Sequence, residues 1–471
     1  MTGVFLGLVV YLVLQLALGF WVGRRVHTRT DYLLAGRKLG PVMSTFSIFA
    51  TWFGAETCIG AAGAAYAGGL AAVTSEPFGY VLALVLFGLV VAVPLWRTRA
   101  TTLADLYRDR WGPIAEKVAV LLLVPSSVLW AAAQIRAFGQ VVGHVADVDL
   151  DLAISGAALV VILYTAAGGL LADAWTDLIQ GIVLIVGLVI LVVVMATSGE
   201  MASLAALPPE LLTLTTPEAT WLSTLEQWGP PVLGSLVAQE LAQRAMAART
   251  PRVARTSTLV AAFTYLLVGL LPILVGLAAI GVLPGLEDPE QALLAVADRH
   301  LSTFLYVIFA GALVSAILST VDTALLVSGG LLSQNVIVPL RPTMSERQAL
   351  LAARVSVVAL GVVAWALAFG SESVYDIVEE ATALGSTGAL VAFVFIWWPR
   401  LGGQGAAVAA MIAGPVWHAV DGRAELTGHP WITSLALALF VYLVVALTIS
   451  RPRPPHMVKS LDQPGDAPAS S

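Results

Sequence analysis

The sequence predicts an all-α integral membrane protein with about thirteen transmembrane helices. The chain has 471 residues, of which 58% are apolar and only 11% are charged, whereas soluble domains carry about 25% charged residues. A bilayer core of about 30 Å needs roughly 20 apolar residues per helix. Stretches of this kind lie near 3–23, 41–68, 75–96, 117–141, 152–170, 173–196, 227–247, 257–283, 303–331, 351–370, 374–398, 405–420 and 431–449.

The basic residues give these spans a direction. With the N-terminus outside, every Lys and Arg falls on the inner side except Arg136, Arg299 and Arg423, as the positive-inside rule predicts. The first span precedes its arginines, whereas a cleavable signal peptide has its positive charges first, so we expect it to stay. These patterns predict a multi-pass protein of the cell (plasma or inner) membrane. The Pro-rich end, 451–471, is predicted to be a disordered cytoplasmic tail.

Two of the spans are predicted to be broken near their middle. Residues 51–58 read TWFGAETC, and the seventh span opens with GPPVLG at 229–234. Transporters with inverted repeats often interrupt the first helix of each repeat at mid-membrane. Two five-helix repeats, about 41–196 and 227–398, would then form a single domain over 1–450, with additional helices 3–23, 405–420 and 431–449. The alternative is that these glycines only allow close helix packing.

The ninth span carries a polar face in SAILSTVDT, residues 315–323. At 100° per residue, Ser315, Ser319, Asp322 and Thr323 lie on one side of a helix. Hydroxyls and backbone carbonyls are hard oxygen ligands that suit a desolvated alkali cation and carry too little charge for a divalent ion. Hydrogen bonding between helices, common for Ser and Thr in membrane bundles, is the alternative. The residues alone leave both interpretations open.

Several acidic and aromatic residues also need a reason to lie in apolar spans. Asp177 is either a further cation ligand or a helix-start acid favoured by the helix dipole. Ionisable groups inside a membrane usually mark functional sites, which applies most strongly to Glu56, beside the predicted break. Aromatic faces attract organic cations, although each aromatic alone also fits packing or an interfacial anchor. The remaining candidates around one cavity are Glu76, Glu240, Glu379, Trp52, Tyr80 and Trp130.

These residues resemble the sodium/solute symporters, a family with a five-plus-five inverted-repeat fold. The resemblance extends from about residue 31 to residue 420. It is carried by DYLLAGRKLG, ATWFGAETCIGAAGAAY, YTAAGGLLADAWTDLIQ, QRAMAARTPRVAR and SAILSTVDTALLVSGGLLSQNV. Thirteen spans with an outside N-terminus are also typical of the proline and choline branches.

The resemblance implies a set of ligands for Na⁺. Carried over position by position, the family's sodium site consists of the backbone carbonyls of Ala50, Phe53 and Ala316 and the hydroxyls of Ser319 and Thr320. Asp177 matches an acidic position that some members use for a second sodium site, with Thr323 nearby. The number of sodium ions stays open.

The resemblance is less definite about the solute. Trp52, Tyr80 and Trp130 match aromatics that enclose the quaternary ammonium in the choline branch, but two further tryptophans of that branch are replaced, by Ala238 and by Val378 or Glu379. Glu56 and Glu76 match positions that contact sugar in the galactose branch, where Thr57 replaces a glutamine. We therefore expect a small solute bearing an amine, choline-like or amino-acid-like. The expected contacts are Trp52, Glu56, Thr57, Glu76, Tyr80, Trp130, Ala238, Glu240 and Glu379.

Together these features predict a sodium-coupled symporter that imports its solute by alternating access. The alternative is a proton-coupled symporter of the same fold, with Asp177 or Glu56 as the proton acceptor; a channel is less consistent with broken helices. The six histidines are scattered, so an enzyme is not expected. The predicted partners are the solute and the lipid bilayer, with no nucleic acid and no obligatory protein partner.

Overall fold

The structure, a computed structural model, describes all residues except 1, 147, 217, 371–373, 399–400 and 449–471. This described part is helical, with one isolated bridge between Leu39 and Ala248. The predicted tail lies outside it. The α-helices are α1 (Thr2–Gly23), α2 (Arg29–Leu34), α3 (Pro41–Trp52), α4 (Ala61–Gly68), α5 (Tyr80–Leu86), α6 (Ala92–Thr98), α7 (Leu103–Trp111), α8 (Pro113–Ala146), α9 (Leu150–Thr197), α10 (Trp221–Leu233), α11 (Gln239–Ala247), α12 (Pro251–Val282), α13 (Ala292–His300), α14 (Thr303–Leu332), α15 (Val338–Leu340), α16 (Glu346–Leu367), α17 (Val374–Ser386), α18 (Ala389–Val394), α19 (Gln404–Ala424) and α20 (Pro430–Thr448).

Short 3₁₀- and π-helical segments connect or extend these helices. They are η1 (Ala35–Arg37), η2 (Glu56–Gly60), η3 (Gly69–Val73), η4 (Thr74–Gly79), η5 (Phe87–Val91), η6 (Glu200–Ala206), η7 (Pro209–Leu212), η8 (Gly234–Val237), η9 (Pro289–Gln291), η10 (Ser333–Ile337) and η11 (Phe395–Trp397).

Seven helical stretches of the described chain are long and apolar enough to cross a membrane. Helix length alone does not establish the predicted thirteen spans, because several predicted spans are assembled from short helices. The span predicted at 41–68, for example, consists of α3, η2 and α4, and the span at 227–247 consists of α10, η8 and α11.

Helix α9, with 48 residues, contains two predicted spans that the chain joins by a reversal. Gly169 leaves the helical conformation (φ 64°, ψ 179°). The hydroxyls of Tyr164 and Thr176 are hydrogen-bonded at 2.6 Å, whereas twelve residues of straight helix would separate them by about 18 Å. The chain therefore folds back at Gly169, at the predicted boundary between 152–170 and 173–196. A Cβ there would lie 2.5 Å from Tyr32 Cδ2, so glycine also allows this close packing.

The stretch 56–98 folds back in the same way. The Thr57 hydroxyl donates to Glu76 Oε2 at 3.2 Å, although nineteen residues of straight helix would span about 28 Å. The reversal follows α4, where Gly69 has φ 70°. Spans 41–68 and 75–96 are thus separate, as predicted.

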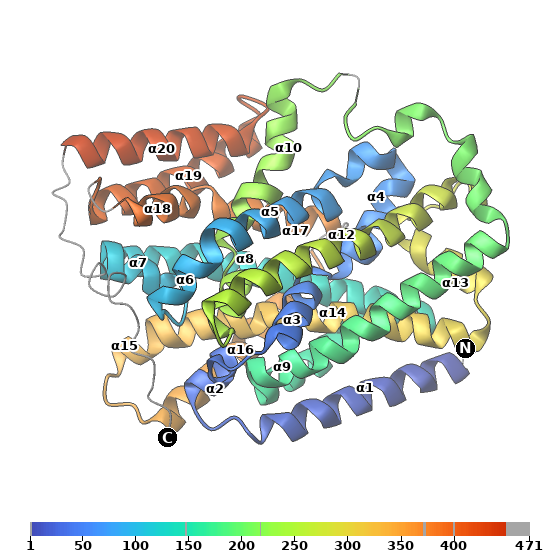
Figure 1. Ribbon diagram of the computed structural model, residues 1–471, viewed down its shortest axis with the longest axis horizontal. Helices are drawn as coiled ribbons and strands as arrows, with labels where there is room; N and C mark the ends of the chain where they lie inside the picture. Colours follow the sequence, from blue (N-terminus) through green and yellow to red (C-terminus); the bar gives the residue numbers. More distant parts are fainter. Residues whose placement is uncertain (1, 147, 217, 371–373, 399–400, 449–471) are drawn as a thin grey trace.

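Both predicted interruptions are present, the second a few residues later than the GPPVLG run that predicted it. Helix α3 ends at Trp52, Phe53 departs from helical geometry (φ −90°, ψ 69°), and η2 begins at Glu56. Helix α10 contains two prolines, and after η8 the backbone at Ala238 is extended (φ −66°, ψ 120°) before α11 begins. Helix α14 is buried along nearly all of its length. It crosses the centre of Figure 1, with α9 and α1 beneath it, and contacts α3 at the first interruption.

Candidate ion and solute sites

The interruption after α3 meets the polar face of α14 at the Thr320 hydroxyl. This hydroxyl lies 3.3 Å from the carbonyl oxygen of Ala50 and 3.2 Å from that of Ala316, and all three residues are buried. The last carbonyls of a helix lack partners within the helix, which makes the end of α3 a source of ligand oxygens. Such separations are compatible with oxygens that share one hard cation. Three of the five predicted sodium ligands thus converge, and Phe53 lies at the end of the same helix.

Ser319, also predicted as a sodium ligand, turns toward α9. Its hydroxyl donates to Asp177 Oδ1, and the Ser47 hydroxyl donates to Asp177 Oδ2 at 2.7 Å. The structure therefore joins Ser319 to the acid predicted for a second sodium site. Thr323, predicted for that second site, donates instead to the carbonyl of Ser319 at 2.8 Å and accepts from the Arg244 guanidinium.

Arg244 forms a buried ion pair next to these groups. Its guanidinium is completely buried, pairs with Asp173, and lies 3.9 Å from Asp177 Oδ2. The side chain of Asp322 also interacts with that of Asp173. The sequence analysis placed Arg244 on the inner side of the membrane; in the structure its side chain, on α11, is buried within the protein. An arginine within a predicted span already indicates an acidic partner.

Gln134 forms hydrogen bonds at the interruption, and Gly54 leaves room for the side chains that meet there. The Gln134 amide accepts from the Ala55 N–H at 2.9 Å and donates to Glu56 Oε2 at 2.6 Å, while Trp130 Nε1 donates to Glu56 Oε1 at 3.1 Å. A Cβ on Gly54 would lie within 2.8 Å of polar atoms of Glu56, Gln134 and Thr320. The sequence analysis did not identify Gln134, although a polar amide one turn after Trp130 in an apolar span was the available signal.

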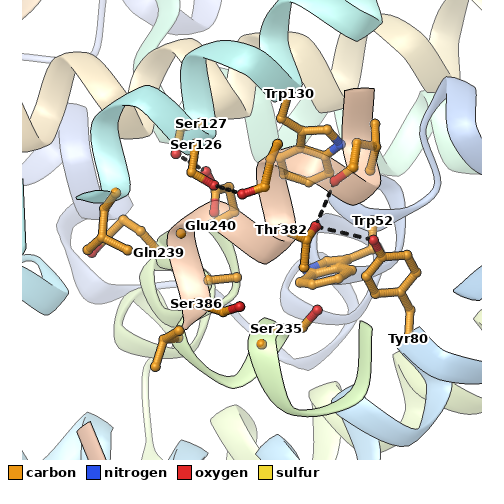
Figure 2. Close-up of a pocket in the computed structure, with 17 residues that line it drawn as sticks. Trp52, Tyr80, Ser126, Ser127, Trp130, Ser235, Gln239, Glu240, Thr382 and Ser386 are labelled. Atoms are coloured by element: carbon orange, nitrogen blue, oxygen red, sulfur yellow. Dashed lines mark hydrogen bonds between the residues drawn. The ribbon is translucent and has the colours of Figure 1, made fainter. Parts of the chain in front are cut away.

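A cavity of about 520 Å³, including its open mouth, lies beside this interruption. Five of the predicted solute contacts line it: Trp52, Tyr80, Trp130, Ala238 and Glu240. Their rings are close, with centroids 5.0 Å apart for Trp52 and Tyr80 and 6.1 Å apart for Trp52 and Trp130. Figure 2 shows the polar residues that also line the cavity: Ser126, Ser127, Ser235, Gln239, Thr382 and Ser386. The sequence analysis did not identify them, because single hydroxyls in membrane helices resemble packing residues.

Three predicted solute contacts do not line the cavity: Glu56, Thr57 and Glu76. Each is buried and turns to a protein partner. The Thr57 hydroxyl is 2.7 Å from the Tyr265 hydroxyl, and Tyr265 also donates to Glu76 Oε2. Glu56 is held by α8, as described above. The side chain of Glu379 lies outside the described residues.

One cavity residue also contacts the helix after α6. Gln239 begins α11, and its side-chain oxygen accepts from the Leu103 N–H, the first peptide of α7, at 2.5 Å. Next to Leu103, the Thr102 hydroxyl donates to Asn335 Oδ1 at 2.9 Å, and Asn335 Nδ2 donates to Asp105 Oδ1 at 2.9 Å. The cavity wall is therefore connected through α7 to η10, at the end of α14.

Comparison with known proteins identifies the family. A model of the sodium:solute symporter family matches residues 32–414. The high-affinity choline transporter 1 of Drosophila melanogaster is 28% identical over 389 residues, covering 79% of this chain and 62% of that protein. The human protein of the same name is 28% identical over 404 residues, covering 79% and 68%. The sodium/proline symporter of Haemophilus influenzae is 24% identical over 436 residues, covering 86% of each. The chain thus spans less than two thirds of the fly relative.

Solved structures show the same fold. A sodium-coupled sialic acid symporter in a substrate-bound, outward-open state superposes with a TM-score of 0.80 at 17% identity, covering 95% of this chain and 98% of that one. A nucleobase-cation-symport-1 family transporter gives a TM-score of 0.59 at 14% identity, covering 92% and 98%. The family and the relatives are transporters rather than enzymes. With the family model matching most of its length, this multi-pass membrane protein belongs to the sodium:solute symporter family.

Proposed function

We propose that this protein is a sodium-coupled symporter that imports a small, amine-bearing organic solute by alternating access. The observation that carries the proposal is the Thr320 hydroxyl, which lies between the Ala50 and Ala316 carbonyls at the interruption of a helix. These neutral oxygens suit a desolvated alkali cation and lack the negative charge that a divalent ion requires. Sodium is a transported substrate here, held by Ala50, Phe53, Ala316, Ser319 and Thr320.

The same proposal includes the arrangement in the membrane. Thirteen spans, with two inverted five-helix repeats at about 41–196 and 227–398, would form one domain over 1–450 in the cell membrane. The N-terminus would lie outside and the tail 451–471 would be cytoplasmic. The matching positions of the two interruptions, after α3 and after α10, support this repeat.

Sodium binding and solute binding are coupled because residues of the two sites are close together in the chain. Ala50 and Trp52 belong to the last turn of α3, and Trp52 forms a wall of the cavity. A sodium ion that orders the end of α3 therefore also orders that wall, and the solute binds more tightly. Coupling free energies of about 1–3 kcal/mol are typical. A second sodium would bind at Asp177, where the hydroxyls of Ser47 and Ser319 converge, with Thr323 adjacent.

The test needs no knowledge of the solute. Thermal unfolding of the purified protein is measured in NaCl and in KCl at equal ionic strength. We expect NaCl to stabilise the wild type, by about 2.7 kcal/mol at a concentration 100 times the dissociation constant. Thr320→Val should lose this stabilisation. The matched control is Thr258→Val, because Thr258 is equally buried and bonds only its own helix, at Ala254. Equal stability of the wild type in both salts would contradict the sodium site and favour proton coupling.

A further inference from the structure

Two hydrogen-bonding groups in the cavity wall have no partner within the described part of the chain. These are the indole N–H of Trp52 and the hydroxyl of Ser235, both buried. A tryptophan N–H can only donate, and a buried donor left unpaired is costly. In Figure 2 the Ser235 side chain points toward Trp52. A solute that presents an oxygen acceptor to this side of the cavity would satisfy both groups.

A carboxylate forms another part of the wall. Glu240 is only 4% exposed, and the Ser127 hydroxyl donates to its Oε1. Within the described chain, no basic side chain lies at salt-bridge distance from it. Arg244, one turn further along α11, is already paired with Asp173. A buried carboxylate without a cationic partner is expensive, so this position favours a positively charged ligand.

The aromatic residues alone would not distinguish one ammonium from another. Trp52, Tyr80 and Trp130 attract any organic cation, but Ala238 and Val378, which also line the cavity, supply no such face. The carboxylate makes the difference. An ammonium with N–H groups can form a charge-assisted hydrogen bond to Glu240, whereas a quaternary ammonium has no donor.

Taking the cavity as the solute site of the proposed symporter, we infer that its solute carries a protonated primary, secondary or tertiary amine and, a few bonds away, an oxygen acceptor. The amine binds Glu240, and the oxygen accepts from Trp52 and Ser235. Either an amino acid or an amino alcohol has this shared chemistry. Quaternary ammonium compounds are discriminated against, because they have no N–H with which to donate a hydrogen bond to the Glu240 carboxylate.

The test uses two methylation series on the purified full chain. The first series consists of amino acids: glycine is methylated stepwise to N,N,N-trimethylglycine, and proline to N,N-dimethylproline. The second runs from ethanolamine to choline. Binding is measured by titration calorimetry in NaCl and in KCl. We expect affinity to fall about 10- to 100-fold at the step that removes the last N–H, the range expected for a hydrogen bond to a charged group. The series that binds identifies the oxygen as carboxylate or hydroxyl.

The outcomes separate this inference from the proposed function. Quaternary compounds that bind as tightly as their N–H analogues, or no binding by any N–H probe, would overturn the inference. A step at the last methylation that is the same in both salts would support the inference and count against sodium coupling. The wild-type series requires no variant to fold.

Two variants and one control variant assign the effect to residues. Glu240→Gln should abolish the step, so that affinities before and after the last methylation agree within about twofold, the additivity error for independent sites. Glu210→Gln, the same change on an exposed segment, should keep the step. Trp52→Phe, which retains the aromatic face and removes the N–H, should weaken binding of all N–H probes about 10-fold. A step that survives Glu240→Gln would overturn the assignment of the amine to this carboxylate.

Discussion

Replacing Arg244 by methionine should strongly destabilise the protein. The side chain is fully buried and is the cation closest to Asp173 and Asp177. At the 3.9 Å separation from Asp177, the Coulomb energy is about 4 kcal/mol for an effective dielectric constant of 20. Removing one partner of a buried ion pair typically costs about 3–5 kcal/mol, because a charge is left without compensation. We expect Arg244→Met to lower the free energy of unfolding by that amount.

The assay is unfolding by sodium dodecyl sulfate titrated into mixed micelles, followed by near-ultraviolet circular dichroism. Adding Asp173→Asn to Arg244→Met should recover at least about 1 kcal/mol, since it removes one of the uncompensated acids. Arg249→Met is the matched control: Arg249 is exposed just after α11, and its loss should change stability by less than about 0.5 kcal/mol. A single variant as stable as the wild type, or a double variant less stable than the single one, would refute the reasoning.

Two further substitutions test the interruption after α3. Gly54→Ala should abolish the stabilisation by NaCl, because its Cβ would lie 2.8 Å from Thr320 Oγ1. The control Gly156→Ala should keep this stabilisation, because a Cβ there meets no atom within 4 Å. A sodium response that survives Gly54→Ala would contradict the site. Tyr265→Phe should destabilise the protein by about 1–3 kcal/mol, since a hydrogen bond to the buried carboxylate of Glu76 is lost. The titration with sodium dodecyl sulfate measures this loss of stability. An unchanged midpoint would show that the Tyr265 hydroxyl does not stabilise the buried Glu76 carboxylate.

The sequence predicted the places where helices end better than the number of helices that cross the membrane. Gly54 lies at the first interruption, and the GPPVLG run precedes the second by a few residues, because glycine and proline act locally on the backbone. Gly169 similarly marks the reversal inside α9. The thirteen spans remain a prediction, because a broken or short helix cannot be identified as a membrane span from its length.

Partners that are distant in sequence were harder to predict. A helical projection places Ser319 on a polar face, and the resemblance adds Thr320 as a sodium ligand. Neither shows that Asp177 lies next to Ser319 and Ala50 next to Thr320. For the same reason, the sequence did not show the hydrogen-bond partners of Glu56 and Glu76. A buried acid indicates a partner, and only the packing of α8 and α12 shows which protein groups bind these two acids.

The hydrogen bond from the Leu103 peptide to Gln239 joins the cavity wall on α11 to the first turn of α7. Ala238 directly precedes Gln239, so a change of backbone conformation at Ala238 would strain this bond. If it breaks, the first turn of α7 loses an acceptor, and the Asn335 contacts beside it are weakened in turn. A solute bound against α11 would therefore also change the contacts between α7 and η10, at a distance from the cavity.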